Sequence, residues 1–371
     1  MKKLISVAFI FLFLTTLAPT AFAAPIVIRL TDTLHQNFTG EFRNDDLAQE
    51  LTPSGRLGQL VFIRENRSNI WVIDPALVDE VVVMTGGYKL TDNAVPVGKE
   101  IAISWLSQLK KISAGNDVVA LAYGNPDVAL TKSMAPGELN LYFSAGKTAL
   151  EKILGRAVRS EPNVRWSVGK TNLNSTLRKD YGSDRIDITN LEKVVALPDV
   201  TQLRLRLARL LSPNLDTRDR QSFVINARMA VDAQLHKLRV NPGKYQITTQ
   251  KAALPVTVIN DFPIGVTINI GMATTNARII VDSFTNVKLA PSSKTQLELN
   301  TFVIAPGQTS VFAQINDLDG NTVIKPVVLA LNATVIDPRL TWFTTGAAIL
   351  LLLAAIAQSV RRVRKGRHSE I

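Results

Sequence analysis

The order of apolar and polar residues along the chain changes character near Pro242 and Gly243. Before this point, short runs rich in β-branched and aromatic residues predict strands, at 59–63, 69–74 and 117–123. Other stretches repeat apolar residues every three or four positions, which predicts helices, at 97–112, 145–154, 200–211 and 218–238. Apolar strands that alternate with helices are typical of parallel sheets. Residues 24–241 are therefore predicted to form an α/β module, either barrel-like or an open, degenerate barrel.

From residue 244 the helical period gives way to strict alternation of apolar and polar residues. The alternating segments are separated by turn residues such as Pro, Gly, Asn and Asp, and they lie at 245–250, 255–260, 266–270, 295–300, 310–315 and 327–335. Seven to eight short strands of this kind in about ninety residues predict an immunoglobulin-like β-sandwich over residues 242–338. The fold class is thus α+β and multidomain.

Both ends of the chain carry membrane-related signals. Lys2 and Lys3, a short apolar run and Ala21-Phe22-Ala23 predict a signal peptide over residues 1–23. The apolar stretch at 339–360 is uncharged from Leu340 on and long enough to cross a bilayer as a helix. A basic tail, residues 361–371, follows at once and holds the cations that set orientation: Arg361, Arg362, Arg364, Lys365 and Arg367. The sequence predicts a single-pass cell-membrane protein whose body is extracytoplasmic and whose C-terminus is cytoplasmic.

Composition narrows the chemistry that the body could perform. The net charge of +11 is concentrated partly at the two ends, so the body is only mildly basic and no nucleic-acid partner is expected. The chain has no cysteine, which excludes disulfides and thiol catalysis. His35, His236 and His368 are far apart in sequence, and no nucleotide-binding glycine motif occurs. Neither a metal site nor a cofactor is therefore expected.

Several motifs, taken in order, resemble a known family. They include Trp71-Val-Ile-Asp-Pro-Ala-Leu77, Ala122-Tyr-Gly-Asn-Pro-Asp-Val-Ala-Leu130, Leu254-Pro-Val-Thr-Val-Ile-Asn260, and the Leu-rich span followed by Arg361-Arg-Val-Arg364. Together they resemble an uncharacterised, domain-of-unknown-function family of actinobacterial single-span cell-envelope proteins, often encoded beside the lipid II flippase. The resemblance covers about residues 58–367. It implies an exported, membrane-anchored protein with a sandwich domain, without implying an activity.

Two carboxylates stand where α/β proteins place their sites. Asp74 ends one predicted strand and Asp127 follows the end of another, and the carboxyl ends of parallel strands are where such sites form. Paired carboxylates there would serve as acid and base on a glycan. The alternative is structural, because Asp-Pro and Asn-Pro-Asp segments commonly form turns and helix caps.

Aromatic and basic residues offer a second kind of site. Tyr123 and Tyr142 flank turns and are expected to be exposed, which makes them candidates for stacking on a glycan. Trp71 and Trp105 lie in apolar patterns and are expected in the core. A third group, Arg204, Arg206 and Arg209, is expected to form a solvated basic helix face.

These observations predict a non-enzymatic binding or scaffolding protein of the cell envelope. Its expected partners are the membrane and either cell-wall glycan or an envelope-biogenesis membrane protein. The alternative is a glycan-active hydrolase or deacetylase-like enzyme that uses Asp74 and Asp127. A deacetylase would normally need clustered histidine ligands, which the spacing of the histidines does not supply.

Overall fold

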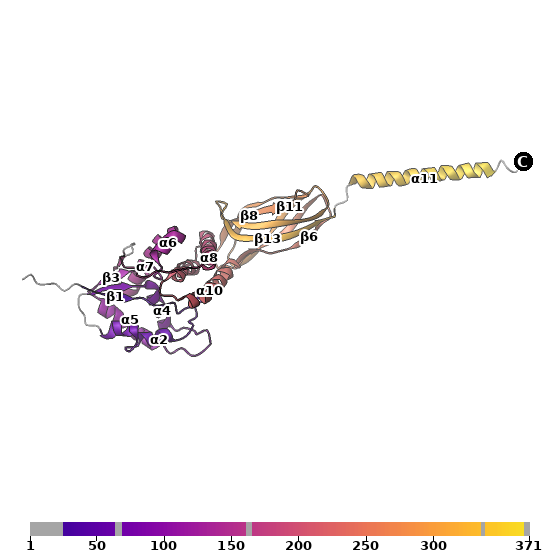
Figure 1. Cartoon of the computed structure of the whole chain (residues 1–371). Coiled ribbons are helices and arrows are strands. Elements are labelled where there is room, and N and C mark those ends of the chain that lie inside the picture. Colours follow the sequence, from indigo (N-terminus) through magenta and orange to yellow (C-terminus); the bar gives the residue numbers. More distant parts are fainter. Residues whose placement is uncertain (1–24, 64–68, 161–164, 335–337, 367–371) are drawn as a thin grey trace, which may run out of the picture. The chain divides into compact units, whose positions relative to one another are not determined.

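The computed structural model describes residues 25–63, 69–160, 165–334 and 338–366, so the predicted signal peptide lies outside the described residues. The chain divides into two compact units, the first made of residues 1–173 and 208–223, the second of residues 174–207 and 224–371. Figure 1 shows a sheet with surrounding helices in the first unit and two stacked sheets in the second.

The first unit is built on a four-stranded parallel sheet with the order β1-β2-β3-β4. Its strands are β1 (Ile26–Leu30), β2 (Asn69–Ile73), β3 (Asp117–Ala120) and β4 (Arg159–Ser160). Because β1 and β4 lie at its edges, the sheet corresponds to the open form of the α/β module. The connections are helical: α2 (Asp46–Leu51), α3 (Arg56–Gly58), α4 (Pro75–Gly86), α5 (Lys99–Ser113), α6 (Val128–Met134) and α7 (Pro136–Leu154).

The core of this unit contains the two tryptophans that the apolar pattern assigned to it. Trp71 and Trp105 are fully buried, and the Trp105 indole donates to the carbonyl of Leu57 at 3.1 Å. The prediction of a strand at 59–63 is wrong, because Gln59–Ile63 forms a π-helix that continues α3. The backbone N–H of Gln59 bonds back to the carbonyl of Gly55 at 2.9 Å, which fixes the run as helical.

Helices of the second unit precede its sandwich in sequence. They are α8 (Ser175–Val194), α9 (Pro198–Arg206) and the part of α10 (Thr217–Leu235) that starts at residue 224. A 3-10 helix, Leu207–Leu211, follows α9 directly. The sequence pattern did not predict α8, whose N-terminus is capped by the Asn174 side chain accepting from the N–H of Leu177 at 2.9 Å.

The sandwich consists of a five-stranded sheet, order β10-β8-β12-β13-β6, and a four-stranded sheet, order β5-β7-β11-β9. Its strands are β5 (Leu238–Val240), β6 (Lys244–Ile247), β7 (Lys251–Asn260), β8 (Val266–Thr274), β9 (Ile279–Val281), β10 (Phe284–Leu289), β11 (Ser293–Val303), β12 (Gly307–Asn316) and β13 (Thr322–Ala333). Alternation decides which side chains fill the core: Val311, Ala313 and Ile315 of β12 are buried, whereas Phe312 between them points out. This confirms the immunoglobulin-like sandwich.

The last element that the structure describes is the helix α11 (Pro338–Gly366). Residues 344–362 of this helix are long and apolar enough to span a membrane, and none of that segment is buried against the protein. Leu350 and Leu351 are about 70% exposed (69% and 72%).

Candidate functional site

Asp74 lies between β2 and α4, and its carboxylate links two segments of the chain. It is the N-cap of α4, and its Oδ1 accepts from the N–H groups of Ala76 and Gly124, each at 3.0 Å. Burial raises its pKa to about 6, against the opposing charge of Arg209. The side chain thus joins the end of β2 to the loop after β3, and it is only 1% exposed.

Asp127 has a similar structural position one strand further on. Its Oδ1 accepts from the N–H of Leu130 at 3.1 Å, which caps α6, and its Oδ2 accepts from the N–H of Thr171 at 2.8 Å. The residue is 8% exposed. Asp74 thus directly follows β2, whereas Asp127 lies seven residues after the last residue of β3, and each carboxylate is bonded to two backbone amides.

A buried ion pair lies near Asp74. The Arg209 guanidinium contacts Glu80 Oε1 at 2.6 Å and donates to the carbonyl of Thr33 at 2.9 Å. The same Glu80 oxygen accepts from the N–H of Gln36 at 2.9 Å. Burial lowers the pKa of Arg209, but the carboxylates of Glu80 and Asp74 outweigh this effect and raise it above its usual value. Arg209 is thus the counter-charge of a buried cluster.

The burial of this ion pair shows that the predicted solvated basic face of Arg204, Arg206 and Arg209 is wrong. Arg209 is 3% exposed, and Arg204 pairs with Glu192 at 2.6 Å in a half-buried position. Glu80 was missed because a single Glu within an apolar helix carries no motif. The one available signal was that Glu80 lies in a mainly apolar run, Val78-Asp-Glu-Val-Val-Val83, where a charged side chain is unusual.

The expectation that Tyr123 and Tyr142 are exposed is wrong. They are 3% and 0% exposed, respectively. The N–H of Tyr123 donates to the carbonyl of Tyr142 at 2.9 Å, which ties the loop after β3 to α7. Gly146 permits this close approach, since a Cβ there would lie 2.5 Å from the carbonyl oxygen of Leu121. Buried in this way, the two rings have no face open to a sugar.

The first unit therefore uses its strand-end side chains to hold its own loops. Within the described residues no group of three or more His, Cys, Asp or Glu side chains is arranged to hold a metal ion. Two hollows lined by solvent-facing side chains lie on the sandwich.

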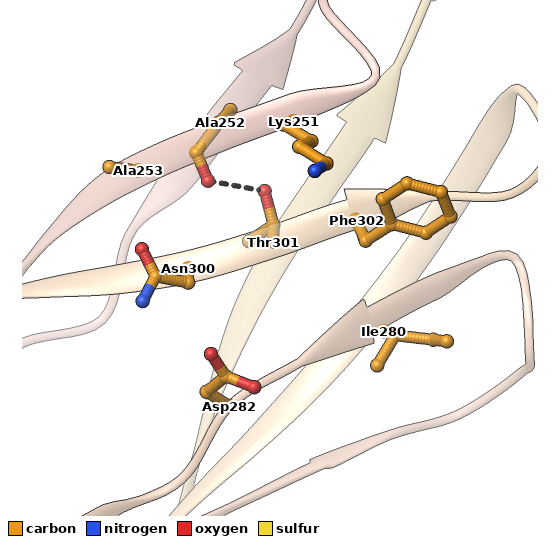
Figure 2. Close-up of a pocket in the computed structure, with 8 residues that line it drawn as sticks. All are labelled: Lys251, Ala252, Ala253, Ile280, Asp282, Asn300, Thr301 and Phe302. Atoms are coloured by element: carbon orange, nitrogen blue, oxygen red, sulfur yellow. Dashed lines mark hydrogen bonds between the residues drawn. The ribbon is translucent and has the colours of Figure 1, made fainter.

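The outer face of the four-stranded sheet carries a shallow hollow of about 420 Å³ (Figure 2). Its lining comes from β7, from β11 and from β9 with the residue after it: Lys251, Ala252, Ala253, Ile280, Asp282, Asn300, Thr301 and Phe302. The strand register explains the grouping. Phe302 of β11 pairs with Lys251 of β7 on one side and with Ile280 of β9 on the other. All three side chains are exposed.

The hollow has an apolar end and a polar end. Figure 2 shows Phe302 and Ile280 at one end and Asn300 and Asp282 at the other. Ile280 is 53% exposed and Phe302 is 36% exposed. The Thr301 hydroxyl donates to the carbonyl of Ala252 at 2.9 Å, which fixes β11 against β7 beneath the hollow. The site offers an apolar platform beside an amide, a carboxylate and an ammonium group.

Sequence reasoning did not single out these residues. A usable signal was present, because Leu299, Thr301 and Val303 occupy the inward positions of β11 and so place Asn300 and Phe302 outward. The alternation of residues within one strand does not predict that β11 pairs with β7 and β9, because this pairing depends on the register of three strands.

The comparisons with known proteins concern mainly the second unit. A model of the family of unknown function DUF6049 matches residues 167–368, which is more than half of the chain. The match includes the sandwich and α11, and it begins after the segments that contain Asp74 and Asp127. No curated protein matches the chain.

Solved structures with similarity to the chain align over about a quarter of it. WR4, an MSP family member of C. elegans, is 11% identical with a TM-score of 0.22, covering 26% of this chain and 98% of its own. A PapD-like domain of human CEP192 is 12% identical with a TM-score of 0.22, covering 27% and 85%. Native alpha-2-macroglobulin from Escherichia coli is 19% identical with a TM-score of 0.21, and the alignment spans 26% of this chain and 16% of that one.

Proposed function

The chain belongs to the DUF6049 family of unknown function, and we propose that it is a membrane-anchored, extracytoplasmic binding protein whose sandwich holds an envelope glycan. The observation that carries this proposal is the hollow on β7, β11 and β9. There, an exposed aromatic ring stands beside polar groups on a rigid sheet. Ligand sites commonly combine an apolar platform with a few fixed polar groups.

The chemistry of the hollow suits a saccharide. A sugar ring has an apolar face that packs on an aromatic ring, and hydroxyls that need both donors and acceptors at its edge. Phe302 and Ile280 supply the platform, and Asn300 offers a donor and an acceptor. Asp282 adds an acceptor and Lys251 a donor, so a ligand with mixed hydrogen-bonding groups would find partners on two sides.

The membrane topology of the chain determines where this site would meet its ligand. We propose that α11 spans the cell membrane, with the signal peptide directing the body outward and the cations at 361–367 keeping the C-terminus in the cytoplasm. An envelope-biogenesis membrane protein is then a natural second partner. Protease added to intact spheroplasts should digest the body and spare a C-terminal tag. Protection of the body would reverse the proposed orientation.

Glycan binding can be measured on the full chain in lipid nanodiscs, with soluble fragments of purified cell-wall glycan as the probe. We expect Phe302→Ala to weaken binding at least tenfold, about 1.4 kcal/mol, because the platform is lost. Gln296→Ala is the matched control, since this exposed residue lies on the same strand and face outside the hollow. Equal affinity of the wild type and F302A would show that the hollow is not the site.

A glycan hydrolase using Asp74 and Asp127 is the second candidate function. The observation in its favour is the pKa of Asp74, which burial raises to about 6, within the range of a general acid. Against it stand the burial of both residues and their bonds to backbone amides. Release of product from purified cell-wall glycan, abolished by both D74N and D127N in folded protein, would favour the enzyme. Absence of turnover in the wild type would remove this candidate.

A further inference from the structure

The sandwich carries a second hollow, of about 490 Å³, on the outer face of its other sheet. Residues of β6, β12 and β13 line most of it, and their outward side chains are mainly amides and hydroxyls: Gln246, Gln308, Ser310 and Asn332, with Lys244 at one side. This surface plays no part in the site described above, which lies on β7, β11 and β9.

The three amides form one row across three strands. In the strand register, Gln308 of β12 pairs with Asn332 of β13, and Asn332 pairs with Gln246 of β6. Neighbouring strands lie about 4.8 Å apart, so the amides are spaced at roughly that interval across the sheet. Gln246 and Gln308 are exposed and Asn332 is half-buried. Among the described residues, no hydrogen bond uses these three side-chain amides.

The chemistry of the row suits a polymer of neutral, hydroxyl-bearing units. Each side-chain amide offers one acceptor oxygen and two donor N–H groups, which suits hydroxyls that both donate and accept. An extended peptide repeats every 3.3–3.4 Å or so and would fall out of step with amides about 4.8 Å apart. A pyranose unit is longer than a peptide residue and matches that spacing better.

The neighbouring rows continue the same face. Two residues along β12, Ser310 pairs with Ala330, which pairs with Lys244. Two residues further, Phe312 pairs with Val328, and they are 40% and 47% exposed. Rows two residues apart along the strands lie about 7 Å from one another. Successive rows on this face carry first amides, then a hydroxyl and an ammonium group, and then an exposed ring. The exposed ring of Phe312 thus lies on the same face, four residues along β12 from the amide row and outside the hollow.

We propose that the row Gln246–Asn332–Gln308 is a second glycan-binding site, so that one chain holds two glycan strands. This inference rests on the proposed function. The two sheets of a sandwich pack through their inner faces, so the two hollows face in opposite directions. One strand cannot lie in both, and two sites on one rigid body bind a polymer network with greater avidity than either alone.

The test is binding stoichiometry by calorimetry, on the full chain in nanodiscs, with a tetrasaccharide of β-1,4-linked N-acetylglucosamine as the probe. We expect two ligands per wild-type chain. Q308A/N332A should bind one, F302A should bind one, and the combined variant should bind none. Thr285→Ala is the control, because this exposed residue lies on β10 of the same sheet and outside the hollow. Unchanged thermal midpoints would establish that the variants are folded.

The outcomes separate the two proposals. One ligand per wild-type chain that F302A abolishes and Q308A/N332A leaves intact overturns the second site, while the proposed function stands. One ligand that only Q308A/N332A abolishes overturns the two-strand model and moves the glycan to the other sheet. No binding to the wild type defeats the proposed function and the second site together.

Discussion

In the first unit, the polar side chains that follow the strands are buried and bonded to the chain's own loops. In the second unit, the polar side chains of the candidate site point away from a sheet into an open hollow. Asp74 and Asp127 each accept from two backbone amides, whereas Asp282 and Asn300 are exposed. The difference shows that position at a strand end does not by itself make a side chain available to a ligand.

The topologies explain this contrast. In a parallel sheet, every strand must be followed by a long connection, and the loops at the carboxyl edge need partners for their backbone groups. The first unit uses carboxylates and Arg209 for that purpose. In the antiparallel sandwich, alternation sends every second residue outward, and ladder hydrogen bonds already satisfy the backbone. Outward side chains such as Asn300 and Phe302 are therefore exposed to solvent.

Removing Arg209 should have the largest effect on the first unit. Arg209→Ala leaves Glu80 buried without its counter-charge, and breaking such a pair costs about 5 kcal/mol, at the upper end of the usual range because Asp74 loses the same partner. Denaturant unfolding followed by tryptophan fluorescence is a suitable measurement, since Trp71, Trp105 and Trp166 all lie in this unit. Arg56→Ala is the control: its ion pair with Asp32 is half exposed and should contribute about 0.2–1 kcal/mol. Equal effects of the two changes would contradict the buried-pair account.

Removing one aromatic ring from each unit tests the same contrast. Tyr142→Ala removes a fully buried ring and should cost about 4 kcal/mol. Phe302→Ala removes a ring on the outer face and should change the free energy of unfolding by no more than about 0.5 kcal/mol. Circular dichroism during urea unfolding measures both. A large loss of stability in F302A would mean that the ring supports the sheet rather than a ligand.

The pKa of Asp74 predicts a pH dependence for the first unit. Burial raises this pKa from 3.8 to about 6 in the folded state, so the folded chain keeps a proton that the unfolded chain releases. The contribution is therefore fully present below about pH 4 and is lost as the pH rises to 6. A shift of two units corresponds to roughly 3 kcal/mol. Asp74→Asn should flatten the stability profile between pH 4 and 6, and an unchanged slope would show that another group titrates.

Much of this architecture was predictable, and particular residues show where prediction stopped. Alternation in β11 and β12 and the uncharged C-terminal run depend on local order, so the sandwich and the apolar helix followed from the sequence. Arg209 and Glu80 lie 129 positions apart, and only the tertiary fold brings them together. Tyr123 and Tyr142 looked exposed because they flank turns, but the approach of α7 to β3 at Gly146 buries them. The hollow around Phe302 depends on a three-strand register that no local pattern encodes.

A modest loss of stability distinguishes a structural Asp127 from a catalytic one. Asp127→Ala removes the N-cap of α6 and the bond to Thr171, and a lost cap costs about 1 kcal/mol. Serine caps helices nearly as well as aspartate, so Asp127→Ser should recover most of that loss in urea unfolding. If the role is structural, glycan binding is the same in all three chains, because the hollow lies on the other unit. A carboxylate that acted in catalysis could not be replaced by a hydroxyl, and D127S would then restore stability without restoring turnover. If D127S recovers stability and glycan binding is unchanged, the contrast is supported: polar side chains of the first unit hold its own loops, and those of the second unit face a ligand.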